Sequence, residues 1–108
     1  MPYPLAPAQR SIYQSIINRI LRAPRDVFII FYVDTCPYCR NALNFLRQRN
    51  YSYKAYDIDR IDGGMYTLLN ALNQDAYLVD FDTRHRTKPL IFLNGRFVGG
   101  YNELTRYY

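Results

Sequence analysis

The chain has 108 residues, about the length of one domain, and its hydrophobic share of 49% excludes disorder along the whole length. Fourteen Lys and Arg residues against nine Asp and Glu give a net charge of +5, which favours acidic partners without defining a function. Two cysteines are too few for a disulfide scaffold, and the longest apolar run, Val27–Val33, is far shorter than the roughly 20 residues that span a bilayer, so we expect no membrane association.

The N-terminal region begins with a proline-bearing stretch that predicts a flexible tail over residues 1–8, followed by a single domain over residues 9–108. From Ser11, apolar side chains recur at helical spacing, which predicts a helix with Ser11 as its N-cap that ends near Arg22, ahead of Pro24. The first 25 residues carry arginines and no acid, as an organelle transit peptide does, but the helix leads into a strand without a linker. We therefore expect a cytoplasmic protein, with organelle targeting as the alternative.

The middle of the chain alternates between strand and helix signals. Val27–Val33 is continuously β-branched or aromatic, which predicts a strand buried on both faces. A helical pattern follows Pro37, and alternation over Tyr51–Ile58 predicts a second strand. Apolar residues then return at helical spacing over Met65–Leu72. Residues 76–86 stay open between an extension of this helix and a short strand.

The C-terminal part carries a hairpin signal. Leu90–Leu93 and Arg96–Val98 flank Asn94-Gly95, a dipeptide that favours a type I′ turn between two strands. Asn102 is placed to cap a last short helix. Strand–helix–strand order gives a parallel pair through a right-handed crossover, and the hairpin adds an antiparallel pair. The sequence therefore predicts an α/β fold with a four-stranded mixed β-sheet and helices on both faces.

Cys36 and Cys39 lie where the buried strand ends and a helix begins. Pro37 suits the first helical position because no backbone N–H is needed there and its fixed φ is helical. Cys36 then occupies the helix N-terminus, whose free N–H groups and dipole stabilise a thiolate. Cys39 follows one turn later, close enough to donate a hydrogen bond to that thiolate or to close a disulfide. This spacing predicts Cys36 as the attacking nucleophile and Cys39 as the resolving thiol.

Two other interpretations of the cysteine pair compete with this one. A structural zinc site takes four ligands, and beyond the two cysteines the chain offers one histidine, His85, far along the sequence. Two buried bystander cysteines at a strand-to-helix junction would be a coincidence. A C-x-x-C pair at such a junction, with proline inside it, favours redox chemistry, and we expect no bound metal.

The segment Thr35-Cys36-Pro37-Tyr38-Cys39-Arg40 resembles the active-site motif of dithiol glutaredoxins, a branch of the thioredoxin-fold superfamily. Thr87-Lys88-Pro89 resembles the family's Thr-Val-Pro loop, whose proline is cis and faces the active cysteine, and Gly99–Leu104 resembles its Gly-Gly segment. The resemblance runs from Val27 to Leu104, and the helix before it resembles the extra N-terminal helix of some members. It implies a thioredoxin-like fold and a glutathione-dependent thiol–disulfide oxidoreductase that reduces protein disulfides and glutathione mixed disulfides.

The resemblance also implies a glutathione site, with glutathione as co-substrate. The residues that it assigns to this site are Tyr38, Lys88, Pro89, Gly100, Asn102 and Glu103. Relatives usually carry a lysine three residues before the first cysteine, where it meets a glutathione carboxylate, but this chain has Val33 there. The cations that can take over the contact are Arg40, Arg84, Arg86 and Lys88.

Two functions of other classes stay open beside the enzyme. An iron–sulfur carrier would hold a cluster between two monomers with Cys36 and external glutathione, although relatives that do so mostly lack a proline after the first cysteine. A redox-inactive basic module would dock an acidic partner, although the basic residues are scattered and no RNA-binding signature is present. We expect instead a monomer that acts on disulfide-bearing or glutathionylated proteins and binds no nucleic acid.

Overall fold

The computed structural model describes residues 7–108, in which helices and strands largely alternate along the chain. The helices are α1 (Pro7–Leu21), α2 (Pro37–Gln48), α3 (Gly64–Gln74), α4 (Ala76–Val79) and α5 (Tyr101–Tyr107), with a 3₁₀ turn, η1 (Ile58–Arg60), ahead of α3. The strands are β1 (Phe28–Tyr32), β2 (Tyr53–Asp57), β3 (Leu90–Leu93) and β4 (Arg96–Gly99). Within the described residues, no helix has both the length and the apolar composition of a membrane span.

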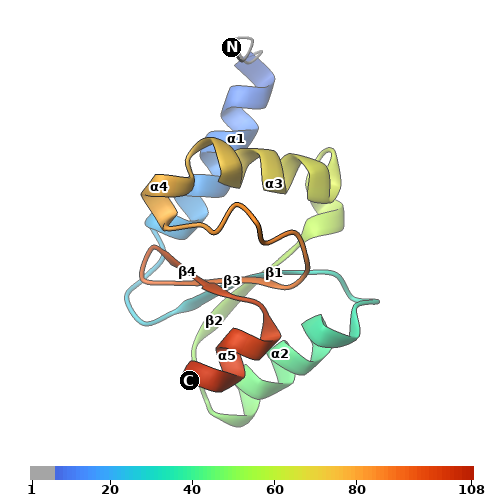
Figure 1. The fold of residues 1–108 in the computed structure, drawn as a ribbon, viewed down its shortest axis with the longest axis vertical. Helices are drawn as coiled ribbons and strands as arrows, with labels where there is room; N and C mark the ends of the chain where they lie inside the picture. The colour runs from blue at the N-terminus through green and yellow to red at the C-terminus, as the bar shows by residue number, and fades with distance from the viewer. Residues whose placement is uncertain (1–6) are drawn as a thin grey trace.

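The four strands form one mixed sheet in the order β2-β1-β3-β4. β1 runs parallel to β2, while the β1–β3 and β3–β4 pairs are antiparallel. Figure 1 shows α1, α3 and α4 on one face of this sheet and α2 and α5 on the other. The arrangement confirms the predicted four-stranded mixed sheet with flanking helices and an additional N-terminal helix.

Alternate side chains of the central strand enter two separate cores. Ile29 and Phe31 pack on the side of α1, α3 and α4, whereas Phe28 and Ile30 pack on the side of α2 and α5. Because both faces of β1 are covered, its sequence is apolar throughout instead of alternating with polar residues. Val33 continues the first of these cores just beyond the strand and is 7% exposed.

The N-terminal helix begins earlier than its sequence pattern indicates. It starts at Pro7, so Pro7 and Ala8 lie in α1 and not in the predicted tail, and Ser11 lies inside the helix instead of capping it. Proline fits the first turn of a helix because the N–H groups there have no intrahelical acceptor. The rest of the predicted tail, residues 1–6, lies outside the described part of the chain.

Two further boundaries are settled by the structure. The ambiguous segment 76–86 begins with the short helix α4, which Asp80 caps with a left-handed φ of 54°, and continues as a loop. The last helix is preceded by Gly100 as its N-cap, so the prediction of Asn102 as the cap was wrong. The predicted hairpin turn is confirmed, since Asn94 and Gly95 both have positive φ, 53° and 78°.

Candidate active site

Cys36 is the N-cap of α2, as the sequence predicts, and Pro37 takes the first helical position. The Cys36 sulfur accepts a hydrogen bond from the backbone N–H of Cys39, with an N···Sγ distance of 3.3 Å. The side chain is half-buried, which leaves the sulfur within reach of a substrate. A sulfur at this place meets the unsatisfied N–H groups of the first turn, which favour a negative charge.

Cys39 has a different environment from Cys36. Its side chain is 0% exposed, in the core between the sheet and α2. Burial, and after it the hydrogen bond with the Cys36 side chain, raises the pKa of the Cys39 thiol to about 12. The charge of Lys88 lowers the same pKa but does not offset the burial. Cys39 is therefore a protonated thiol at neutral pH, and the less reactive of the pair.

The loop before β3 lies directly beside the cysteine pair. The Lys88–Pro89 peptide bond is cis, as the resemblance implies. The carbonyl oxygen of Lys88 lies 3.8 Å from Cys36 Sγ, although 52 positions separate the two residues in the sequence. Pro89 is buried while Lys88 is exposed, so the loop presents Lys88 to solvent next to the thiol.

A groove of about 270 Å³ adjoins this loop, and we call it the Lys88 groove. Its lining residues are Tyr38, His85, Thr87, Lys88, Gly100, Tyr101, Asn102 and Glu103. Apart from Pro89, every residue that the resemblance assigned to glutathione is in this lining. Pro89 lies next to Lys88, and its carbonyl oxygen approaches Gly100. The structure thus gathers segments from α2, the loop before β3 and the start of α5 beside Cys36.

The Gly-Gly segment allows α5 to start close to the loop. Gly99 has a φ of 131°, and a Cβ atom added there would lie 2.6 Å from Cγ of Glu103. The backbone N–H of Gly100 donates a hydrogen bond of 2.8 Å to Oε1 of Glu103. Glu103 therefore stabilises the start of α5 as well as lining the groove. The spacing from Gly100 to Glu103, half of a capping box, could have revealed this role in the sequence.

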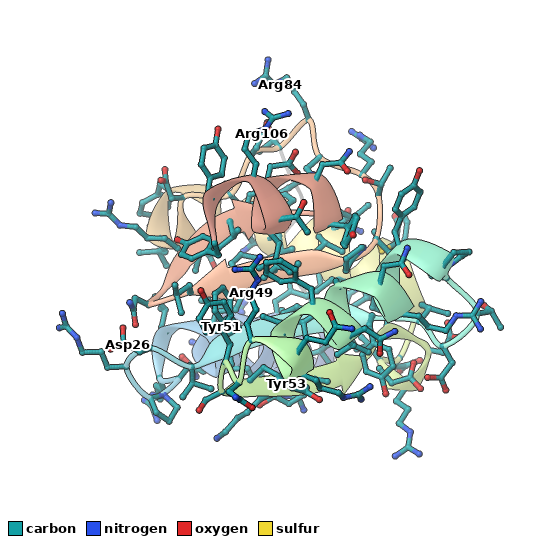
Figure 2. All side chains as sticks on the ribbon, turned by 90° about the horizontal axis from the view of Figure 1, so that it is seen from below. Asp26, Arg49, Tyr51, Tyr53, Arg84 and Arg106 are labelled. Carbon is teal, nitrogen blue, oxygen red and sulfur yellow. The ribbon has the colours of Figure 1, made fainter. Side chains whose placement is uncertain are left out.

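Of the four candidate cations for a glutathione carboxylate, Lys88 alone lines the groove. Arg84 instead pairs with Asp82 at 3.1 Å, and its side chain, 90% exposed, extends away from the body of the protein (Figure 2). The hydrogen bonds from Arg84 hold the pKa of Asp82 below its ordinary value. Arg40 and Arg86 are exposed and are not among the lining residues.

Three groove residues are not among the predicted contacts, namely His85, Thr87 and Tyr101. The sequence singles out His85 only as a zinc-ligand candidate, yet its Nε2 lies 2.9 Å from the carbonyl oxygen of Thr87. Tyr101 lies across from Tyr38, with 6.2 Å between the ring centroids. Neither position follows from periodicity, because His85 is in a loop and Tyr101 begins a short helix.

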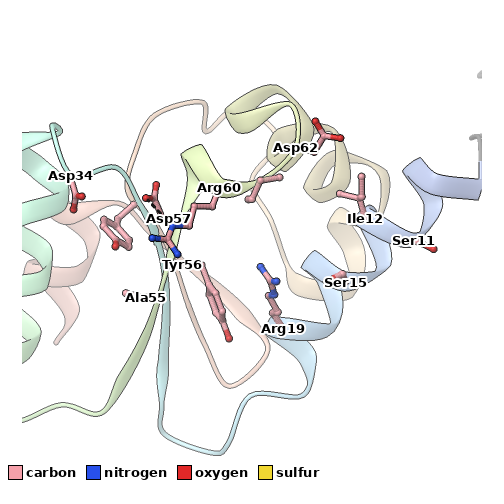
Figure 3. Close-up of a pocket in the computed structure, with 12 residues that line it drawn as sticks. Ser11, Ile12, Ser15, Arg19, Asp34, Ala55, Tyr56, Asp57, Arg60 and Asp62 are labelled. Carbon is pink, nitrogen blue, oxygen red and sulfur yellow. Dashed lines mark ion pairs between the residues drawn. The ribbon is translucent and has the colours of Figure 1, made fainter.

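A larger cavity, of about 650 Å³, lies at the edge strand β2 between α1 and η1 (Figure 3). It is lined by Ser11, Ile12, Ser15, Arg19, Tyr32, Asp34, Ala55, Tyr56, Asp57, Arg60, Ile61 and Asp62. Asp34 belongs to the loop that leads to Cys36. Neither cysteine is among the lining residues of this cavity or of the Lys88 groove, but Lys88 of the groove has its carbonyl oxygen 3.8 Å from Cys36 Sγ. Volume alone would favour this cavity as the active site, whereas the position of the reactive sulfur favours the smaller Lys88 groove. Among the described residues, no group of three or more His, Cys, Asp or Glu side chains is arranged to hold a metal ion.

Comparisons with known proteins identify the family to which the chain belongs. The family model described as Glutaredoxin matches residues 28–98. The chain is 45% identical over 98 residues to a "Probable glutaredoxin" of Acanthamoeba polyphaga mimivirus, an alignment that covers 90% of this chain and 92% of the relative. It is 37% identical over 83 residues to Glutaredoxin-1 of Variola virus, covering 77% and 72%. The chain therefore belongs to the glutaredoxin family, and it is a thiol–disulfide oxidoreductase.

Solved structures confirm the thioredoxin-like fold. The buckwheat glutaredoxin–glutathione complex superposes with a TM-score of 0.73 at 21% identity, covering 95% of this chain and 84% of that one. A dithiolic glutaredoxin from Trypanosoma brucei brucei superposes with a TM-score of 0.66 at 28% identity, covering 84% and 82%.

Proposed function

We propose that this glutaredoxin reduces glutathione mixed disulfides and protein disulfides through Cys36 and Cys39, with glutathione as co-substrate. The observation that carries the proposal is the position of the Cys36 sulfur at the start of α2, beside the carbonyl of Lys88 and the groove that this residue lines. The buckwheat relative was solved in complex with glutathione, which supports the same ligand here. That the protein works as a monomer in the cytoplasm stays a prediction from its sequence.

The first step is attack by the Cys36 thiolate on the glutathione sulfur of a mixed disulfide. The bond between the two substrate sulfurs breaks, a disulfide forms between Cys36 and glutathione, and the released thiolate of the substrate takes up a proton. The half-buried Cys36 sulfur is accessible for this attack, whereas the buried Cys39 sulfur is not.

A second thiol then frees Cys36. With a glutathione mixed disulfide, another glutathione thiolate attacks, releasing oxidised glutathione and the Cys36 thiolate. With a protein disulfide, Cys39 attacks Cys36, releases the reduced protein and closes a Cys36–Cys39 disulfide, which two glutathione molecules reduce.

The environment of Cys39 suits this order of events. Two of the causes that raise its pKa come from Cys36 itself, namely the hydrogen bond and the charge of the neighbouring sulfur. Both causes disappear once Cys36 is part of a mixed disulfide, so the pKa of Cys39 falls. The resolving thiol is thus protonated while Cys36 is free and loses its proton more readily after Cys36 has reacted.

Lys88 provides the charge that glutathione requires in this groove. The co-substrate carries two carboxylates, and Lys88 is the cation of the lining. Because Val33 is packed in the core, the position of the family's usual lysine cannot serve this purpose without a rearrangement. Glu103, which also lines the groove, supplies a carboxylate for the ammonium group of glutathione.

The direct test is reduction of a glutathionylated peptide, coupled to NADPH oxidation by glutathione reductase. We expect NADPH consumption that is proportional to the protein concentration and absent without glutathione. A rate equal to the uncatalysed one would overturn the proposal. The ultraviolet–visible spectrum and the iron content of the purified protein separate it from the carrier alternative, because a bound cluster would colour the protein.

A further inference from the structure

His85 lines the Lys88 groove, and no step of the proposed reaction uses it. We propose that His85 is a positioning residue that orients the Thr87–Lys88 peptide group toward bound glutathione. This inference rests on the proposed glutathione site and adds a determinant of its affinity.

The contact between His85 and the loop defines which ring nitrogen carries the proton. Nε2 lies 2.9 Å from the carbonyl oxygen of Thr87 and 3.4 Å from the hydroxyl oxygen of the same residue. A carbonyl oxygen only accepts hydrogen bonds, so the shorter contact requires a proton on Nε2. The imidazole therefore donates to the Thr87 carbonyl.

The imidazole is itself held in place. Its ring meets Phe97 of β4 edge-on, with 5.0 Å between the centroids. The backbone N–H of His85 donates a 2.9 Å hydrogen bond to the carbonyl of Asp82. On a further side, Cε1 lies 3.4 Å from the point where a Cβ atom of Gly100 would stand. The ring contact with Phe97 and the anchored backbone of His85 therefore hold the Nε2 donor toward the Thr87 carbonyl.

Peptide geometry transmits this direction to Lys88. The Thr87–Lys88 bond is trans, so its carbonyl and its N–H point in opposite directions within one plane. Because His85 holds the Thr87 carbonyl, the N–H of Lys88 points away from the imidazole. Among the described residues, none accepts a hydrogen bond from this N–H. The carbonyl of Lys88 faces Cys36, 3.8 Å from the sulfur. Lys88 thus offers a donor and an acceptor beside the reactive thiol.

Glutathione differs from other small thiols in having peptide groups next to its sulfur. A bound glutathionyl group can pair its backbone with the N–H and C=O of Lys88, in the manner of an added strand. Loss of the His85 donor lets the Thr87–Lys88 plane rotate and weakens this pairing, while the Cys36 thiolate stays unchanged. The effect of His85 is therefore specific to thiols that carry a peptide backbone.

Two variants separate the donor from the ring. His85→Phe retains a ring that packs against Phe97 but removes the donor, and His85→Gln retains an N–H donor without the ring. The measurement is the second-order rate constant for attack by the reduced protein on two forms of one peptide, in rapid-mixing experiments. One form carries glutathione in a mixed disulfide, and the other carries 2-mercaptoethanol, which is neutral and has no peptide group.

We expect His85→Phe to react about fivefold to tenfold more slowly with the glutathionylated peptide, the change expected when one hydrogen bond to the substrate is weakened. Its rate with the mercaptoethanol form should equal that of the wild type, and His85→Gln should recover most of the loss. Equal rates of His85→Phe and wild type on the glutathionylated form would overturn the inference, as would an equal slowing on both forms. If the wild type itself does not distinguish the two peptides, the proposed glutathione site fails and the inference fails with it.

Discussion

The backbone N–H of Cys39 donates a hydrogen bond across 3.3 Å to the sulfur of Cys36, yet the two side chains have different environments one helical turn apart. Cys36 is half-buried at the start of α2, whereas Cys39 is 0% exposed. This hydrogen bond thus links the reachable sulfur of Cys36 to the backbone of a residue whose own sulfur solvent cannot reach. This difference in burial gives the two thiols different roles, attack for Cys36 and resolution for Cys39.

Alkylation should therefore be confined to Cys36. At pH 7.5, limiting iodoacetamide should modify Cys36 and leave Cys39 unmodified, because the thiolate is the reacting species and burial raises the pKa of Cys39 to about 12. Peptide mass mapping reads the site, and the same protein in denaturant, where both cysteines should react, is the control. Comparable labelling of both cysteines in the native protein would contradict the assignment.

The same raised pKa predicts how stability depends on pH. Above about pH 9 the unfolded protein loses the Cys39 proton while the folded protein keeps it, since the pKa of Cys39 is raised from 9.0 to about 12 on folding. The contribution of the Cys39 thiol to the free energy of unfolding is thus complete below pH 9. Above pH 9 this contribution falls, by at most about 1.4 kcal/mol per pH unit. Urea unfolding at pH 8 and pH 10 should show a smaller cost of Cys39→Ala at the higher pH. If the free energies of unfolding of the wild type and Cys39→Ala changed with pH in parallel, this prediction would be refuted.

Lys88 and Arg84 offer a matched pair of cation substitutions. Lys88→Met should raise the KM for a glutathionylated peptide about threefold to tenfold, because an exposed cation of the groove loses its contact with a carboxylate. Arg84→Met should leave the KM within twofold, because Arg84 is paired with Asp82 and lies outside the groove. Steady-state kinetics at low and high salt provide the check, since screening should shrink the Lys88 effect. A larger increase in KM for Arg84→Met than for Lys88→Met would show that Arg84, and not Lys88, contacts the glutathione carboxylate.

Glu103 and Asn102 test the start of α5. Glu103→Ala removes the acceptor of the 2.8 Å hydrogen bond from the Gly100 N–H and should lower the free energy of unfolding by about 1–2 kcal/mol. Asn102 is exposed, and Asn102→Ala should change this free energy by less than about 0.5 kcal/mol. Urea denaturation of the two variants provides the comparison. Equal losses would mean that the Glu103 carboxylate does not support the helix.

Features with a strong local cause could be read from the sequence. Asn94-Gly95 specifies its turn because both residues tolerate positive φ, and both adopt it. Pro37 marks the start of α2 and so places Cys36 at the N-cap. The apolar run of β1 indicates burial on both faces, which the two cores confirm.

Features decided by tertiary contacts could not be read in the same way. The segment 76–86 combines one helical turn with a loop that has no periodicity, so its path depends on the groups it meets. The position of His85 depends on Phe97 and Gly100, which approach it only in the folded chain. The sequence shows that Val33 replaces the usual lysine, but it does not show that the Val33 side chain packs into the core.

Serine substitutions in the two cysteines test the central claim most directly. Turnover of a glutathionylated peptide should vanish in Cys36→Ser and persist in Cys39→Ser, because a second glutathione can resolve the mixed disulfide on Cys36. Reduction of a protein disulfide should be lost in both variants, since it needs Cys39 as well. Activity of Cys36→Ser on the glutathionylated peptide, or the same loss of that activity in Cys39→Ser, would contradict the account.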